Sequence, residues 1–251
     1  DPIDPAKVRE ALEQCEPKLV AIVHAETSTG VLQPLGEISK IVRDAGALFL
    51  VDAVTSLGGT QLKIDEWGID AVYSGSQKCI SAPPGLSPVS FNTKALEAID
   101  SRKSKVQSFY LDISLIRKYW TGAKRVYHHT GPISMVYAMH EALRIVLEEG
   151  LEARFERHMN NHMKLRKGLE DMGFEFVVAP EYRLPMLNAI KVPQGVDDAA
   201  VRGRLLNEYN IEIGAGLGDF AGKVWRIGLM GESCTPNHIN MLLGALKNIL
   251  G

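Results

Sequence analysis

Residues 47–52 read Ala-Leu-Phe-Leu-Val-Asp, a continuous apolar run that ends in a carboxylate. Such runs are typical of strands that are buried on both faces of a parallel sheet. Residues 19–23 repeat the apolar pattern, and residues 35–45 between them have helical spacing and stop at Gly46, a residue suited to a left-handed cap. Strand, helix and strand at this spacing predict a right-handed crossover in a parallel sheet.

Further elements extend this unit in both directions. A helix is expected from Pro5 after the N-cap Asp4, and a third strand is expected at 69–75. The segment 86–91 contains a proline and predicts a return strand at or near an edge. Beyond it, the patterns predict helices at 132–149, 151–172, 197–209 and 237–249, and short strands at 174–178, 188–192 and 223–228. We therefore expect an α/β chain with a large domain, of which 1–149 is the C-terminal portion, and a smaller α+β domain at 150–251.

Composition excludes several classes of protein. The chain has 251 residues, 45% of them hydrophobic, and 28 Lys plus Arg balance 30 Asp plus Glu without a block of like charge. Without a block of positive charge, nucleic acid is not expected as a partner. A membrane is not expected either, because the longest apolar runs fall far short of the ~20 residues that cross a bilayer. The chain begins Asp-Pro-Ile without a methionine. We expect it to be a fragment that lacks an N-terminal part.

The three cysteines, Cys15, Cys79 and Cys234, are odd in number and far apart. They predict neither a disulfide framework nor a metal site, and they favour a reducing compartment such as the cytoplasm. A peroxisomal or mitochondrial location stays open, although the terminal Ile-Leu-Gly does not match the Ser-Lys-Leu address.

Asp52 and Lys78 are the first candidates for chemistry. Each follows a predicted parallel strand, and ligands of such sheets collect beyond the carboxyl ends of the strands. An acid and an amine are therefore expected at one edge. An ordinary ion pair or two solvated side chains would fit the same placement.

Three motifs occur in order: Glu-Thr-Ser-Thr-Gly at 26–30, Val-Asp-Ala-Val-Thr-Ser-Leu-Gly-Gly at 51–59, and Ser-Gly-Ser-Gln-Lys at 74–78. Their order and spacing resemble the fold-type-I pyridoxal-phosphate enzymes, and within them the class-V alanine:glyoxylate and serine:pyruvate aminotransferases. The resemblance continues through residues 82–85, 108–112, 127–130 and 225–229, so it covers essentially the whole chain. It implies the fold-type-I architecture and a pyridoxal 5′-phosphate cofactor.

The resemblance implies a role for each candidate. Lys78 would hold the cofactor as a Schiff base and, once free, would move the proton at the substrate Cα, because a reversible imine needs an amine. Asp52 would bind the pyridine nitrogen and keep the ring cationic. Arg226, in the middle of a predicted strand, would bind the substrate α-carboxylate, a task suited to a planar guanidinium; a structural salt bridge is the other interpretation.

The same resemblance extends to the cofactor's surroundings. Thr27 would lie near the ring oxygen, Val54 would pack on one ring face, and Gln77 would contact the phosphate, a dianion that needs several donors. Tyr127 and Thr130 match residues that reach the phosphate from a neighbouring subunit, which implies a homodimer. A surface loop is the alternative for these two.

Other features are set aside. His158 and His162 lie four apart on a predicted helix without a third ligand or the glutamate of a zinc motif, and they are expected to be solvated. The glycines at 214–218 lack the pattern of a phosphate loop and predict a flexible loop near the substrate entrance. Cys79 is expected to be a packing residue whose side chain points away from that of Lys78.

The resemblance implies a transaminase that moves an amino group from a small amino acid, alanine or serine, to a small 2-oxo acid, glyoxylate or pyruvate. One alternative is a lyase of the cysteine desulfurase type, whose relatives generally carry His immediately before the lysine, where this chain has Gln77. The other is a non-catalytic fragment or dimerisation module, because the family normally has more than a hundred residues before the position of Asp1.

Overall fold

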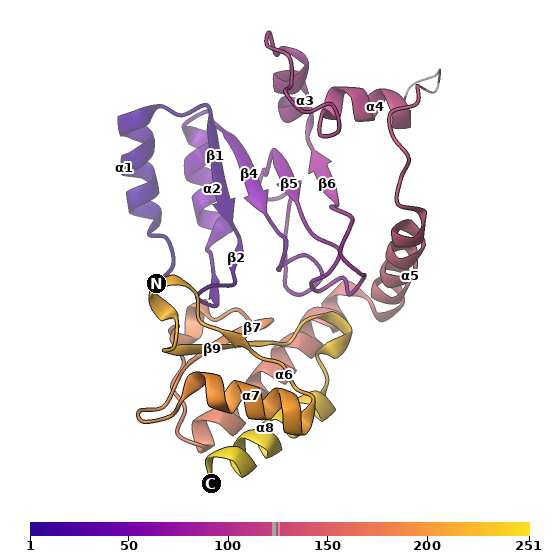
Figure 1. Cartoon of the computed structure of the whole chain (residues 1–251). Coiled ribbons are helices and arrows are strands. Elements are labelled where there is room, and N and C mark those ends of the chain that lie inside the picture. Colours follow the sequence, from indigo (N-terminus) through magenta and orange to yellow (C-terminus); the bar gives the residue numbers. More distant parts are fainter. Residues whose placement is uncertain (122–123, 125) are drawn as a thin grey trace.

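The computed structural model describes residues 1–121, 124 and 126–251. A four-stranded sheet occupies the first part of the chain, and a smaller sheet packed with helices occupies the last part (Figure 1). The first sheet has the order β1-β4-β5-β6, from β1 (Leu19–Val23), β4 (Leu48–Asp52), β5 (Ala71–Tyr73) and β6 (Val89–Phe91). The pairs β1–β4 and β4–β5 are parallel and β6 is antiparallel, as the sequence predicts.

Two helices cover one face of this sheet. They are α1 (Pro5–Cys15), capped by the Asp4 side chain, and α2 (Leu35–Asp44). Residues of alternating position on the strands, such as Ile22, Phe49 and Val51, form one buried cluster with Ile38 and other residues of α2. The core on this side is thus built from the periodicities of the strands and of α2 together.

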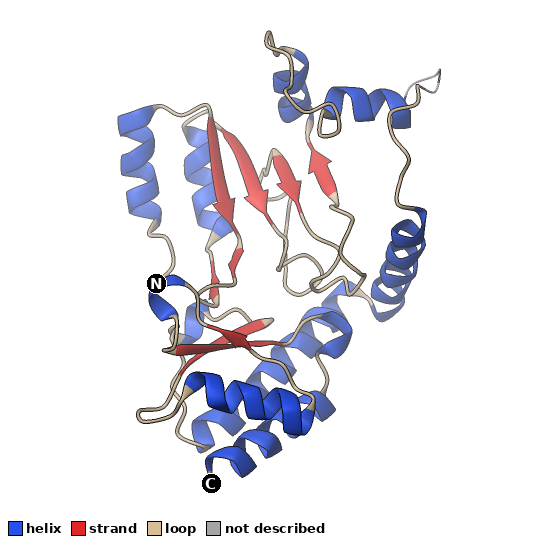
Figure 2. Cartoon of the chain, viewed as in Figure 1, coloured by secondary structure: helices blue, strands red, loops and turns tan. Residues whose placement is uncertain are grey.

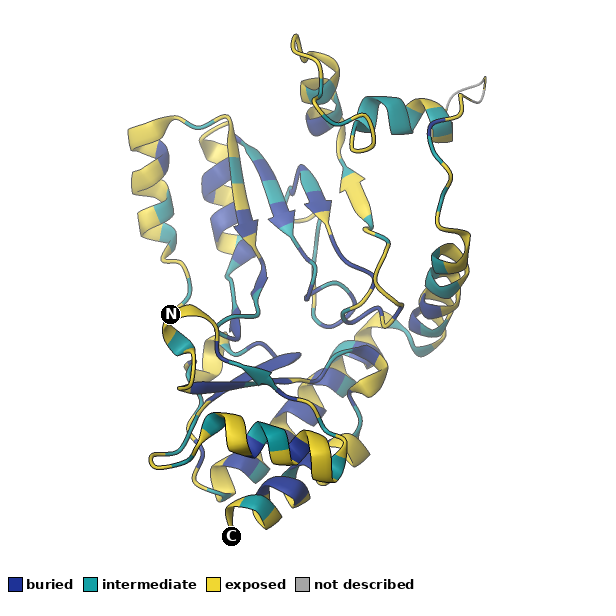
Figure 3. Ribbon diagram, in the orientation of Figure 1, coloured by how far each residue is buried: buried dark blue, intermediate teal, exposed yellow. Residues whose placement is uncertain are grey.

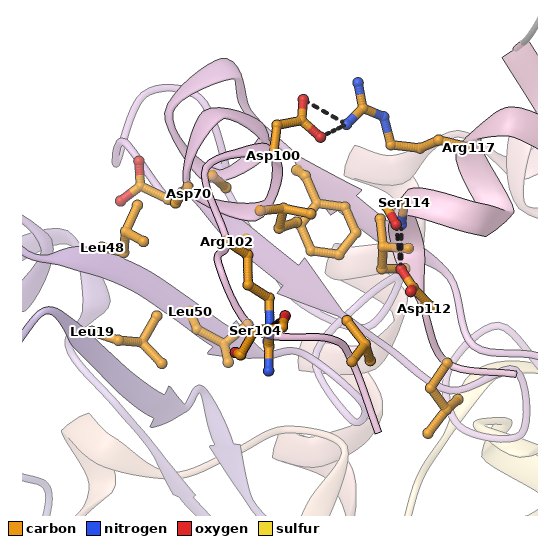
Figure 4. Close-up of a pocket in the computed structure, with 18 of the residues that line it drawn as sticks. Leu19, Leu48, Leu50, Asp70, Asp100, Arg102, Ser104, Asp112, Ser114 and Arg117 are labelled. Carbon is orange, nitrogen blue, oxygen red and sulfur yellow. Dashed lines mark hydrogen bonds and ion pairs between the residues drawn. The ribbon is translucent and has the colours of Figure 1, made fainter. Parts of the chain in front are cut away.

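The expectation that these strands are buried on both faces is wrong for the described chain. The second face borders a hollow of about 950 Å³, toward which Leu19, Leu48 and Leu50 point (Figure 4). Leu19 at the start of β1 remains 49% exposed. An apolar run shows that both faces favour burial, but burial also needs an element that packs against each face.

Two helices near this hollow have no counterpart among the predicted elements. They are α3 (Thr93–Asp100), whose N-cap Asn92 accepts a hydrogen bond from Ala95 N, and α4 (Ile113–Thr121). The Arg117 guanidinium on α4 donates to Asp100 at 2.9 Å and joins the two helices. Both helices are short, which weakens a periodic signal.

The last part of the chain begins with two consecutive helices, α5 (Ile133–Glu149) and α6 (Leu151–Asp171), separated by Gly150. A three-stranded sheet of order β7-β9-β8 follows, with α7 and α8 beside it (Figure 2). Their bounds are β7 (Leu187–Lys191), α7 (Asp198–Tyr209), β8 (Gly214–Ala215), β9 (Val224–Gly228) and α8 (Pro236–Leu250). Buried residues of α6, α7, α8 and β9 form a second cluster around Trp225 (Figure 3).

The predicted strand 174–178 is reduced to one bridge between Phe176 and Ile190. Short elements complete the chain, namely β2 (Ala25–Glu26), β3 (Val31–Leu32), η1 (Pro180–Tyr182), η2 (Gly218–Phe220) and η3 (Gly231–Ser233). No helix within the described residues is both long and apolar enough to cross a membrane.

The β2–β3 hairpin connects the two parts. Gly30 in its turn has φ +82°, and an added Cβ would lie 3.1 Å from Leu187 O. Gly30 O accepts the Leu184 N–H at 2.9 Å, and Val31 forms a bridge with Arg183. Only glycine combines this backbone angle with so close an approach. The hairpin after β1 is therefore held against the second sheet.

Candidate active site

Asp52 is the last residue of β4, and its carboxylate is fixed by two donors. Val54 N–H donates to Oδ1 at 2.8 Å, and Tyr73 OH, from the paired position on β5, donates to Oδ2 at 2.8 Å. The hydrogen bond to Asp52, with some burial and the carboxylate charge, raises the pKa of Tyr73. Each Asp52 oxygen has a second lone pair for a further donor.

Lys78 lies in the loop after β5. Ser74 Oγ donates to Ala53 O at 3.0 Å and Ser76 Oγ donates to Pro83 O at 2.6 Å, which anchors the chain that leads to the lysine. The Lys78 amine has no hydrogen bond or ion pair with any residue that the structure describes. It lines a cavity of about 400 Å³ whose wall also includes Met230. An amine without a partner in the described part of the chain thus lies at a cavity wall.

Arg226, in the middle of β9, contacts the loop that contains Thr27. Its Nε donates to Ala215 O at 2.7 Å and its Nη1 donates to Thr27 O at 3.2 Å. No carboxylate pairs with Arg226 within the described part of the chain, so the structural salt bridge is not observed. A guanidinium has five N–H donors, and those left over can bind an anion.

Val54 and Gln77 both lie close to Gly75. A Cβ added at Gly75 would be 2.7 Å from Gln77 Oε1 and 3.4 Å from Val54 Cγ1. Gln77 also lines the cavity beside Lys78. The fold therefore brings these two predicted cofactor contacts close together, near the lysine.

The side chains of Tyr127 and Thr130 form a hydrogen bond, with 2.7 Å between their hydroxyl oxygens. Tyr127 is 68% exposed. They belong to residues 126–132 before α5, and neither is among the residues that line the cavity beside Lys78. His128 in the same segment stacks on Phe109 at 4.4 Å between ring centroids. Within one chain, the structure does not bring Tyr127 and Thr130 to Lys78.

The expectation of solvated histidines on α6 is wrong. His158 and His162 are buried, and burial lowers the pKa of each. His158 Nδ1 lies 2.7 Å from Arg154 O, and His162 Nδ1 lies 2.6 Å from Asn188 Oδ1. Since a carbonyl can only accept, both rings donate from Nδ1. Solvation of these histidines was predicted wrongly because their hydrogen-bond partners are a backbone carbonyl, for His158, and a side chain of another segment, for His162.

Two further expectations can be compared with the structure. Cys79 is a packing residue, as predicted: it is buried, its Sγ donates to Thr55 O, and burial raises its pKa to about 12. The segment 214–218 is not wholly a loop, because Gly214 and Ala215 form β8 and pair with β9.

Several groups around the site were not expected from the sequence. Tyr73 supports Asp52, and its position at the end of the third strand is a signal that alternation could have provided. His24, at the end of β1, donates its backbone N–H to Asp52 O at 2.9 Å. Arg154 reaches the carbonyl of Cys79 from α6, and no local pattern predicts that contact.

Comparisons with known proteins agree with this geometry. The profile of the aminotransferase class-V family matches residues 2–222. The crystal structure of an alanine–glyoxylate aminotransferase from Nostoc sp. superimposes with a TM-score of 0.97 at 47% identity, covering 100% of this chain and 66% of that one. Alanine–glyoxylate aminotransferase of Rattus norvegicus is 42% identical over 97% of this chain and 60% of its own length.

A relative with another substrate is also similar. The (S)-ureidoglycine–glyoxylate transaminase of Bacillus subtilis (strain 168) is 38% identical over 98% of this chain and 64% of its own length. The chain thus spans slightly less than two thirds of the proteins it matches. The fold is that of the fold-type-I aminotransferases, as the sequence predicts.

Proposed function

The chain belongs to the aminotransferase class-V family, and from this premise we propose that it carries the lysine of a pyridoxal-phosphate transaminase. The reaction moves an amino group from a small amino acid, alanine or serine, to a small 2-oxo acid, glyoxylate or pyruvate. The observation that carries the proposal is the Lys78 amine, which has no partner among the described residues and lies on a cavity wall after a strand whose parallel neighbour ends in Asp52.

The family consists of pyridoxal-phosphate enzymes, and the residues present fit this cofactor. Asp52 is held by two donors and keeps acceptor capacity for the pyridine N–H. Lys78 is free to attach the aldehyde covalently. When bound, the cofactor supplies an electron sink for the substrate Cα.

The remaining roles belong to this chain's side chains. Lys78 takes the proton that leaves the substrate Cα, and Arg226 binds the substrate carboxylate with donors that its two carbonyl acceptors leave over. Three further side chains surround the cofactor. Thr27 lies near its ring oxygen, Val54 packs on one ring face, and Gln77 contacts its phosphate.

We also propose a homodimer and a division of the chain near Gly150. Tyr127 and Thr130 are exposed and are not among the residues that line the cavity beside Lys78 of their own chain, which supports a role in the site of a second copy. Separate buried clusters before and after α5 support a large domain at 1–149 and a small domain at 150–251.

The test is covalent capture of the cofactor in the natural full-length protein. Borohydride reduction after loading with pyridoxal phosphate is expected to add the cofactor to Lys78, read by peptide mass spectrometry. Lys78→Arg should abolish the adduct, while the matched Lys94→Arg should retain it. An adduct on another lysine, or none, would refute the proposal.

Substrate assays separate the two alternatives. With alanine and glyoxylate we expect pyruvate and glycine, whereas sulfide release from cysteine without pyruvate formation would favour the desulfurase-type lyase. Gln77 in the place of that family's histidine supports transamination. A full-length protein that dimerises but binds no cofactor would instead be a non-catalytic module.

A further inference from the structure

A cluster of charged side chains around the buried Arg154 contacts the residue that follows Lys78. The side chain of Arg154, on α6, is fully buried, and its Nη2 donates to the backbone carbonyl of Cys79 at 2.7 Å. Its Nη1 donates to Glu232 Oε1 at 2.8 Å and also to Glu149. Burying a guanidinium is costly unless partners compensate it, so these contacts hold its position firmly. They fix the residue that follows Lys78 relative to α6.

A second arginine belongs to the same cluster but does not touch Cys79. Arg157 donates to Glu149, to Gly231 O and to Cys234 O. Hydrogen bonds from Arg157 and from Arg154 lower the pKa of Glu149 to about 2, so this carboxylate is ionised at neutral pH. Arg157 therefore shares Glu149 with Arg154 and holds the Gly231 carbonyl, but it is Arg154 that contacts the Cys79 carbonyl.

The turn at Gly231 and Glu232 also contacts residues 79–81, the segment after Lys78. Glu232 N–H donates to Ser81 Oγ at 2.9 Å, and a Cβ added at Gly231 would lie 2.8 Å from Cys79 O. Gly231 N–H donates in turn to His158 Nε2 at 3.0 Å. Residues 79–81 are thus enclosed between Arg154 and this turn.

The enclosed segment is strained. Ser81 has φ +66°, a left-handed conformation that costs a residue other than glycine about 1–2 kcal/mol. Its N–H closes a turn by donating to Lys78 O at 3.0 Å. Strained backbone persists only where its surroundings hold it. Since the Lys78 amine has no described partner, its direction depends on this backbone.

We propose that Arg154 is a positioning residue for Lys78, acting through the Cys79 carbonyl and through Glu232. The proposal rests on the function proposed above for Lys78. Lysine in place of Arg154 has no planar fork with which to bind Cys79, Glu232 and Glu149 together. The backbone after Lys78 would then relax, and a displacement of about 1 Å in a reacting group can cost about 100-fold in rate.

The experiment compares Arg154→Lys with Arg157→Lys in the natural full-length protein. The first measurement needs no cofactor: the rate and pH dependence of Lys78 acetylation by acetic anhydride, with exposed Lys40 as internal standard. The second is kcat and KM for alanine in the loaded enzyme, well below the melting temperature of each variant.

For Arg154→Lys we expect Lys78 labelling to change by about threefold or more and kcat to fall about 10- to 100-fold, with KM within about threefold. Arg157→Lys keeps the Cys79 contact and loosens the turn only at the Gly231 carbonyl, while the Gly231 and Glu232 N–H bonds remain, so each quantity should change by no more than about threefold. A merely structural role would move both variants alike, through stability. Equal effects, or unchanged Lys78 labelling and kcat in Arg154→Lys, would overturn the proposal.

Should Arg154→Lys fail to fold, Glu232→Gln and Ser81→Ala decide. Ser81→Ala removes the hydroxyl that accepts the Glu232 N–H, and Glu232→Gln removes the carboxylate charge that pairs with Arg154. Each is expected to lower kcat about 3- to 10-fold with a change in Lys78 labelling. No change in either variant would overturn the proposal. Loss of the proposed function has its own readout, because borohydride would then fail to label Lys78 in the wild type.

Discussion

His24 gives a pH dependence of stability whose size follows from the structure. The ring is buried against the edge of Trp67 at 5.8 Å between centroids, and burial lowers its pKa from 6.5 to about 4. Its Nδ1 has no hydrogen-bond partner among the described residues. A charged ring would therefore be strongly disfavoured in the folded state.

The sign follows from linkage. Between pH 6.5 and about 4 the unfolded chain binds a proton at His24 that the folded chain does not, so stability rises with pH in this window. It is fully present above about pH 6.5 and falls as the pH decreases. At about 1.4 kcal/mol per pH unit, the whole window corresponds to about 3 kcal/mol, and the part down to pH 5 to about 2 kcal/mol.

The test is urea unfolding between pH 7 and pH 5, followed by tryptophan fluorescence. His158 and His162 add slopes of the same sign, so His24→Gln is compared with wild type, and His140→Gln on the exposed side of α5 is the control. Wild type should lose about 2 kcal/mol more than His24→Gln. Identical losses in the two proteins would refute the reasoning.

Two further predictions concern packing around the candidate site. Gly231→Ala is expected to cost about 2–5 kcal/mol, from a left-handed φ of +57° and overlap with Ser81, whereas Gly222→Ala, at φ +71° with no neighbour within 4 Å, should cost about 1–2 kcal/mol. Equal melting temperatures for the two variants would contradict the close approach of Gly231 to Ser81. In the folded protein, a thiol reagent should modify exposed Cys15 rapidly and the buried Cys79 and Cys234 only on unfolding; fast reaction of all three would contradict their burial.

Local patterns predicted most of the elements correctly. The N-caps Asp4 and Asp197 mark real helix starts, and the apolar runs of β1 and β4 are parallel neighbours. The short α3 and α4 were missed, because short helices leave little periodic signal. The candidate pair Asp52 and Lys78 could be found because a strand end is itself a local feature of the sequence.

The amino-acid sequence by itself was enough to predict the parallel strands and to identify the family. The apolar runs and the ordered motifs that carry this information are local stretches of neighbouring residues. Only the tertiary structure decided which partners the charged side chains have. Arg226 meets Thr27 across 199 positions of sequence separation, and Arg154 meets Cys79 across 75. His158 and His162 are buried for the same reason. Burial and pairing depend on atoms that distant segments bring together, and no periodicity within one segment records them.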